Sequence, residues 1–147
     1  MKNSLTDLLR KSLDSLDDAA EILKYSLENC TKIGLKQKYS FEEMDHLEAF
    51  TSRFARLSDI VIQKLFRIID KIDLEDEGTV RDRINNAEKK GLIDNAETFV
   101  QIRIVRNDIT HEYHSENLKE IFIMALDLTP HLLLCANSIK IYCKKYF

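Results

Sequence analysis

Two long stretches of this chain repeat apolar residues with the period of an α-helix. The first runs from about Ser4 to Asn29 and the second from Ser40 to about Ile72. Only three glycines and one proline occur in 147 residues, so few positions interrupt a helix. Long amphipathic segments of this kind bury their apolar stripe against other helices. The pattern therefore predicts an all-α fold.

Residues that begin and end helices divide the chain further. Ser40 and Glu43 have the spacing of a capping box and open the second helix. A similar cap at Thr79 predicts a short third helix that ends near Gly91, since glycine suits a helix C-terminus. The segment between Asn29 and Ser40 is expected to be a connector. The helices expected so far thus alternate in direction across short connections.

The second half of the chain continues in the same way. Asp94, with Glu97 three residues later, predicts the start of a fourth helix, and Ser115 that of a fifth. Thr129-Pro130 either kinks the fifth helix or begins a sixth, because proline suits a first turn. No repeat or long linker divides the chain. We therefore expect residues 1–147 to form a single domain, an up-and-down helical bundle.

Charge and cysteine content limit the kinds of ligand and the cellular compartment that the sequence is compatible with. The formal net charge is -3, so any binding of RNA has to come from a local basic patch. Three widely spaced cysteines, Cys30, Cys135 and Cys143, are expected to be reduced, buried thiols rather than a disulfide framework. We see no signal peptide and no apolar run that approaches the roughly 20 residues of a membrane span. These features predict a cytoplasmic protein that does not associate with a membrane.

Side chains with useful chemistry are concentrated between residues 106 and 113. On a helical wheel, Arg103, Arg106, Asn107, His111 and Tyr113 share one broad face. The opposite face is apolar and is expected to be buried, with Ile102, Val105 and Ile109. This part of the fourth helix therefore packs with one side and presents its polar groups from the other.

The polar face is suited to phosphoryl chemistry that needs neither a metal nor another cofactor. The guanidinium of Arg106 can bind phosphate oxygens with two parallel hydrogen bonds. The imidazole of His111 can accept a proton from a ribose 2′-OH or donate one to a leaving oxygen, and Asn107 can assist. Arginine and histidine are also favoured near any helix C-terminus by the helix dipole, which is the structural alternative. A two-fold dimer would supply two histidines, one for each role.

The spacing Arg106, four residues, His111, one residue, Tyr113 resembles the signature of HEPN-domain proteins. With Asn107 directly after the arginine, it is similar to the HepT toxin branch of that family. The order of long and short helices fits the resemblance across most of the chain. The resemblance implies a HEPN-like homodimer in which the motif lies at a cleft between the protomers.

The resemblance also implies a function. The chain would be the toxin of a type II/VII-like toxin–antitoxin module, a metal-independent endoribonuclease with tRNA among its suggested targets. Arg106 would bind the phosphate, His111 would be the acid–base group, and Asn107 would assist, with Arg103 gathered at the same cleft. The partner would be MntA, a minimal nucleotidyltransferase antitoxin that neutralises the toxin by adding AMP to the motif tyrosine, here Tyr113.

Three alternatives remain open from the sequence. The chain can be a non-catalytic, substrate-binding subunit of a nucleotidyltransferase, which would tolerate loss of His111 better than an enzyme would. A di-iron site would need Glu43-x-x-His46 and Asp108-x-x-His111, but the second motif has Asp where that design uses Glu. A plain helical adaptor needs no active site at all, and a motif remains a hypothesis until its geometry is known.

Overall fold

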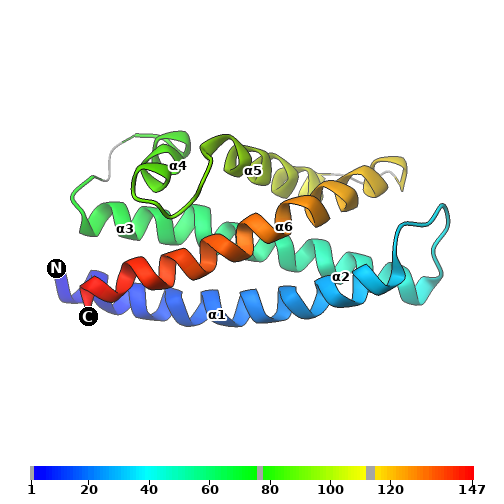
Figure 1. Ribbon diagram of the computed structural model, residues 1–147, viewed down its shortest axis with the longest axis horizontal. Coiled ribbons are helices and arrows are strands. Elements are labelled where there is room, and N and C mark those ends of the chain that lie inside the picture. The colour runs from blue at the N-terminus through cyan, green and yellow to red at the C-terminus, as the bar shows by residue number, and fades with distance from the viewer. Residues whose placement is uncertain (1, 76–77, 112–114) are drawn as a thin grey trace.

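The computed structural model describes residues 2–75, 78–111 and 115–147, and this part of the chain contains helices and no strands (Figure 1). The predicted all-α class is therefore confirmed. In chain order the elements are α1 (Lys2–Ile33), α2 (Phe41–Ser58), the π-helix η1 (Asp59–Leu65), α3 (Phe66–Ile72), α4 (Val80–Lys89), α5 (Ala96–His111), α6 (Ser115–Cys143) and the short 3-10 helix η2 (Lys144–Tyr146).

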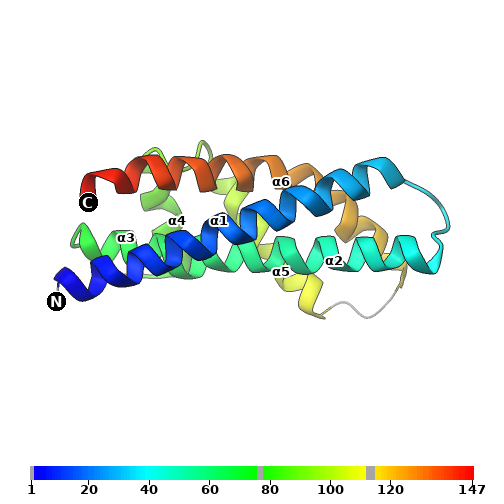
Figure 2. The same ribbon diagram turned by 90° about the horizontal axis from the view of Figure 1, so that it is seen from below.

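The helices form an antiparallel bundle. The helices α2, η1 and α3 follow one another without a break and make one long rod, which runs beside α1 in the opposite direction (Figures 1 and 2). The helix α6 returns to the end at which α1 begins and contacts α1, α2 and α5. The shorter α4 packs against α3 and α5. The predicted helical bundle is thus present in a single chain.

Aromatic rings join the rod to the later helices. Phe50 and Phe54 of α2 are fully buried. Phe50 packs edge to face on Phe122 of α6 with ring centroids 5.8 Å apart. The ring centroids of Phe66 and of Phe99 in α5 are 6.1 Å apart. Such pairs contribute about 0.5–1.5 kcal/mol each beyond the burial of their area. These contacts fix α5 and α6 against the rod.

The first helix is longer than predicted. It continues to Ile33 instead of ending near Asn29, because Cys30 adds another buried residue to its apolar stripe. Gly34 then ends it with a positive φ of 74°, and its N–H donates to the Cys30 carbonyl at 3.0 Å. This conformation favours glycine at a helix C-terminus. The predicted connector therefore begins at Gly34.

The predicted capping boxes are confirmed at two helices. Ser40 and Glu43 exchange hydrogen bonds at the start of α2, and Thr79 and Asp82 do so at the start of α4. The expected cap at Asp94 is wrong, because Asn95 accepts from the Thr98 N–H at 3.2 Å. The predicted cap at Ser115 adjoins residues outside the described part of the chain.

Pro130 lies inside α6 and does not begin a new helix. It removes one backbone donor, a change that costs about 3 kcal/mol in an isolated helix. Thr129 is fully buried and donates its hydroxyl to the Ala125 carbonyl at 2.6 Å. Buried residues continue on both sides, from Phe122 to Ile139, so packing against the bundle holds the helix together through the proline.

One helix of the described chain has the length and composition to cross a membrane. An 18-residue window within Leu118–Tyr146 has a mean hydropathy of 1.4, so the expectation that no apolar run approaches the length of a membrane span is wrong. Its buried residues, among them Leu132 and Ile139, contact the other helices of the bundle. A central helix of a bundle satisfies the same criterion, so the segment is only weak support for a membrane span.

The three cysteines are free and buried, as predicted. Burial raises the pKa of Cys30 to about 11 and that of Cys143 to about 12, and it also raises the pKa of Cys135. A raised pKa keeps a thiol protonated and unreactive at neutral pH. These side chains therefore belong to the core.

A compact group of charged and phenolic side chains ties the end of the chain to the middle. In this Lys90 cluster, the Lys90 ammonium lies 2.6 Å from Asp70 and 3.0 Å from Asp73. Tyr142 and Tyr146 donate their hydroxyls to Asp73 at 2.6 and 2.5 Å. Burial opposes ionisation of Asp73, but these three donors outweigh it and hold its pKa below the usual range. The cluster fixes the C-terminus against α3 and α4.

Candidate functional site

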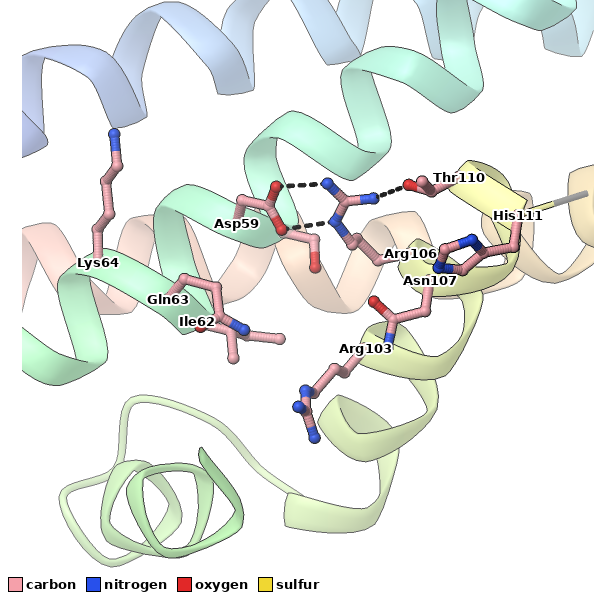
Figure 3. A pocket seen from close by; sticks show the side chains of 10 residues that line it. Asp59, Ile62, Gln63, Lys64, Arg103, Arg106, Asn107, Thr110 and His111 are labelled. Carbon is pink, nitrogen blue, oxygen red and sulfur yellow. Dashed lines mark hydrogen bonds and ion pairs between the residues drawn. The ribbon is translucent and has the colours of Figure 1, made fainter. Parts of the chain in front are cut away.

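The polar face of α5 lies as the helical wheel predicts. Ile102 and Val105 are fully buried, and Ile109 packs partly buried against the core. A hollow of about 440 Å³ separates the other side of α5 from η1 (Figure 3). We call it the Arg106 hollow, and α5 supplies Arg103, Arg106, Asn107, Thr110 and His111 to its wall. The four described residues of the predicted site are therefore brought together.

Asp59, the first residue of η1, holds the guanidinium of Arg106. Nε donates to Oδ1 at 2.7 Å and Nη2 donates to Oδ2 at 2.8 Å, while Nη1 donates to the Thr110 hydroxyl (Figure 3). The hydrogen bonds to Asp59 outweigh partial burial and raise the pKa of Arg106 above its usual value. Arg106 is thus always charged and has a defined orientation.

The held guanidinium still has donors to offer. It carries five N–H groups, of which the contacts to Asp59 and Thr110 use three. Among the described residues, one N–H on Nη1 and one on Nη2 have no partner. A phosphate oxygen that entered the hollow would therefore meet free donors on a guanidinium that is already in place, which reduces the entropy lost on binding.

His111 ends α5 and lines the same hollow as Arg106. Its side chain is exposed, so the imidazole is accessible to a bound molecule. Asn107 lies one turn earlier and is also exposed. Between these two described residues no hydrogen bond is present, so the expected orientation of His111 by Asn107 is not seen in this conformation. Both side chains are instead available to a ligand.

Two further cations extend the positive charge of the hollow. In Figure 3 the Arg103 side chain points away from the Arg106–Asp59 pair, and Lys64 of η1 points away on the side of α1. Among the described residues neither forms an ion pair. The Arg106 charge is balanced by Asp59, so Arg103 and Lys64 leave the hollow with a net positive charge. An anionic ligand would be attracted to such a site.

The sequence interpretation missed η1 and its contribution to the hollow. Asp59 and Lys64 belong to a π-helix, a rare conformation that occurs frequently at functional sites. Asp59 is separated from Arg106 by 47 residues, so no local spacing links the two. One signal was present: Ile60, Val61 and Ile62 are consecutive and all buried, which is wider than the apolar stripe of an ordinary amphipathic helix.

Tyr113, the predicted site of modification, lies outside the described residues. Glu43 belongs to the capping box of α2 and also pairs with Lys36, so the first half of the di-iron motif has a structural role. In the part of the chain that the structure describes, no group of three or more His, Cys, Asp or Glu side chains is placed to hold a metal ion.

Comparisons with known proteins add no relative from which a function could be transferred. No protein-family model, no curated protein and no solved structure matches the chain. The residues of the Arg106 hollow and their geometry are therefore the features that indicate a function.

Proposed function

We propose that this protein is a metal-independent endoribonuclease of the HEPN kind, and that Arg106 and His111 carry its activity. The observation that supports the proposal most is the shared hollow, in which a charged, oriented Arg106 and an exposed His111 project from one helix. A fixed phosphate-binding group beside an acid–base group is the minimum that transfer of a phosphoryl group from RNA requires.

The proposed reaction is an intramolecular transesterification. The 2′-oxygen of the ribose attacks the adjacent phosphorus, and the bond from phosphorus to the 5′-oxygen of the next nucleotide breaks. The 2′-OH proton passes to a histidine, and a second proton passes from a histidine to the departing 5′-oxygen. The products are a 2′,3′-cyclic phosphate and a 5′-hydroxyl. Arg106 stabilises the negative charge that develops on the phosphate oxygens.

One His111 is required as base and another as acid if both protons move in one step. We therefore propose a homodimer in which two copies of the Arg106 hollow face each other across a two-fold axis. In the toxin–antitoxin setting proposed from the sequence resemblance, a minimal nucleotidyltransferase partner would neutralise the toxin by adding AMP to Tyr113. A bulky anionic group only two residues after His111 would obstruct the entry of RNA.

The decisive comparison uses wild type, His111→Ala and His131→Ala on total cellular RNA in EDTA. His131 is exposed on α6 and does not line the Arg106 hollow, so it controls for loss of a surface histidine. We expect wild type and His131→Ala to cleave, and His111→Ala to be slower by about 10²- to 10⁴-fold. Equal cleavage by all three proteins would contradict the role of His111.

Absence of cleavage by folded, dimeric wild type with unmodified Tyr113 would contradict the nuclease proposal. It would favour the substrate-binding subunit of a nucleotidyltransferase, the alternative kept from the sequence. Light scattering on the same samples tests the dimer, and intact mass tests modification at Tyr113.

A further inference from the structure

Two more hollows adjoin the Arg106 hollow. One, of about 540 Å³, lies where α1, α2, η1 and α5 meet and shares Asp59, Lys64 and Arg106 with it. The other, of about 430 Å³, lies between α1 and the rod and shares Ile60 and Lys64 with its neighbour. Because neighbouring hollows share parts of their walls, the three follow one another along the rod.

The walls of these hollows carry charge of almost one sign. Beyond Arg103 and Arg106 they contain a set of cations that we call the basic strip: Lys11, Arg56, Lys64, Arg67 and Lys71. Among the described lining residues Asp59 is the only carboxylate, and it is already paired with Arg106. The whole chain has 22 basic and 25 acidic residues, so this segregation is a local feature.

The basic strip is free to bind a ligand. Within the described part of the chain none of its five cations forms an ion pair, whereas Lys36, Lys90 and Lys140 elsewhere do. A run of unpaired cations repels itself and is stabilised by an anion that bridges its members. A polyanion satisfies this requirement better than a single small anion.

The dimensions of the strip suit a chain of phosphates. Arg56 and Lys71 are separated by 15 residues of continuous helix, which is roughly 20 Å at the rise of an α-helix. Lys11 of α1 adds a cation from the opposite wall. The strip therefore presents positive charge over several nucleotides, and it begins beside Arg106, where cleavage is proposed.

The lining residues also indicate which part of a nucleic acid the basic strip would contact. No phenylalanine, tyrosine or tryptophan side chain occurs among the described residues that line the three hollows. Proteins that read single strands by base stacking use aromatic rings for this purpose. Contacts along the strip would therefore be made to phosphates, which gives strong salt dependence and little base preference.

We propose that the basic strip binds the sugar–phosphate backbone of single-stranded RNA on one side of the bond to be cleaved. This inference rests on the proposed function, which makes RNA the polyanion and the Arg106 hollow the point of cleavage. A hollow between packed helices admits a single strand more readily than a duplex, whose phosphates lie on a wide convex surface. The strip would supply affinity, and the Arg106 hollow would supply the chemistry.

The test separates the strip from the site. The triple variant Lys11→Gln, Arg67→Gln, Lys71→Gln is made in a His111→Ala background, so that RNA is bound without being cleaved. Binding of an oligouridylate of about 24 nucleotides is measured at several salt concentrations. We expect affinity at low salt to fall about ten- to hundredfold. The slope of the logarithm of the binding constant against the logarithm of salt concentration should become less steep by about 2, because each of the three lost phosphate contacts contributes about 0.7.

A matched control removes the same charge elsewhere. Lys24, Lys89 and Lys119 are exposed, do not line the three hollows, and are changed together to Gln. This control should keep the salt slope of the parent. Equal slopes for the strip variant and the control, with both proteins folded by circular dichroism, would overturn the proposal. So would loss of binding to anionic phosphatidylserine vesicles with unchanged binding to the oligouridylate, which would indicate a membrane surface instead.

Failure of the nuclease proposal would be distinguishable from failure of this one. If the strip variant loses affinity but wild type never cleaves RNA, the strip stands as a binding surface and the catalytic role of His111 falls. If wild type cleaves RNA and the strip variant binds it as well as the control does, the nuclease stands and the strip is overturned. If wild type cleaves RNA, the same three substitutions made with His111 intact should leave cleavage of the dinucleotide UpA near normal, because UpA is too short to reach Lys71.

Discussion

The molecule has two groups of interacting charges, and they are arranged differently. In the Lys90 cluster every charge has a partner, and the side chains of Lys90 and Asp70 are only 9% and 2% exposed. In the Arg106 hollow, Asp59 and Arg106 remain 37% and 27% exposed, and the other cations that line the hollow form no ion pair with any described residue. A charge buried with its partner is costly to separate, whereas an exposed pair contributes little to stability.

This difference indicates different tasks. The Lys90 cluster uses its donors and acceptors to hold the C-terminal helix against the middle of the chain. Around the Arg106–Asp59 pair, N–H groups of Arg106 and neighbouring cations have no partner among the described residues. Polar groups whose hydrogen bonds and ion pairs are made within the protein stabilise the fold. Polar groups at the surface that lack such partners are available to a ligand. Variants at the two places should therefore change different measured quantities.

The largest effect is expected when Lys90 is changed to Met. Removing the ammonium leaves Asp70 buried without its ion pair, which should lower the free energy of unfolding by about 3–5 kcal/mol. Lys89→Met is the control, because Lys89 is exposed beside it and should change stability by less than about 0.5 kcal/mol. Urea titration of both proteins measures the difference. Equal unfolding free energies would show that the cluster is not a structural element.

The next effect concerns activity. Arg106→Lys keeps the positive charge but loses the fork that binds both Asp59 and a phosphate, so single-turnover cleavage should slow about 100-fold. Arg103→Lys keeps a cation whose orientation is not fixed by Asp59, and its rate should stay within about threefold of wild type. The unfolding free energy should be nearly unchanged in both. A normal rate for Arg106→Lys would show that the fixed guanidinium is not needed.

A smaller effect, and a pH dependence, are expected at Tyr146. Tyr146→Phe removes a donor to ionised Asp73 and should cost about 1.5 kcal/mol at neutral pH. Because the folded state depresses the pKa of Asp73, the stability from this carboxylate is present above its unfolded pKa and is lost as pH falls below about 4.

Thermal melting at neutral pH and near pH 2.5 checks this prediction. The difference between wild type and Tyr146→Phe should be clear at neutral pH and should shrink in acid. Tyr25→Phe, at an exposed phenol of α1, should match wild type at both pH values. A difference that stayed constant or grew in acid would mean that Tyr146 acts through its ring and not through Asp73.

The smallest effect is expected at Asp59, and it shows whether this residue orients Arg106 or is needed for folding. Asp59→Asn removes the charge that orients Arg106, so cleavage should slow about tenfold, which is an increase of about 1.4 kcal/mol in the activation barrier. Because the hollow becomes more positive, RNA affinity should stay the same or increase. Asp127→Asn, an equal charge change at an exposed position of α6, should leave the rate unchanged. Loss of rate and affinity together would indicate damage to the fold.

Local patterns in the sequence account for much of the fold. Periodicity located the long helices, and the Ser40 and Thr79 caps marked two helix starts correctly. The end of α1 was missed, and the sequence left open whether the helix continues through Pro130, because buried contacts from distant segments outweigh local propensity there. The rules for caps and breakers describe an isolated helix, and packing can override them.

Only the part of the candidate site that α5 contributes was predictable from the sequence. The period of α5 placed Arg106 and His111 on one face, and the structure confirms that both line one hollow. Asp59 and the basic strip were missed, since their relation to α5 arises from the tertiary contact between two helices and from the π-helix η1. Contacts across tens of residues leave no trace in the spacing of a single sequence.

The most direct test of the central claim is the chemistry of the ends that the protein produces in EDTA. We predict 5′-hydroxyl ends and 2′,3′-cyclic phosphates from an RNA with one mapped cleavage site. Cleavage should stop when a single 2′-deoxy nucleotide replaces the attacking ribose, and His111→Ala should cleave the all-ribose RNA about 10²- to 10⁴-fold more slowly than wild type. Continued cleavage of the 2′-deoxy substrate, or 5′-phosphate ends, would contradict acid–base chemistry at His111 and remove the basis for assigning the Arg106 hollow to RNA cleavage.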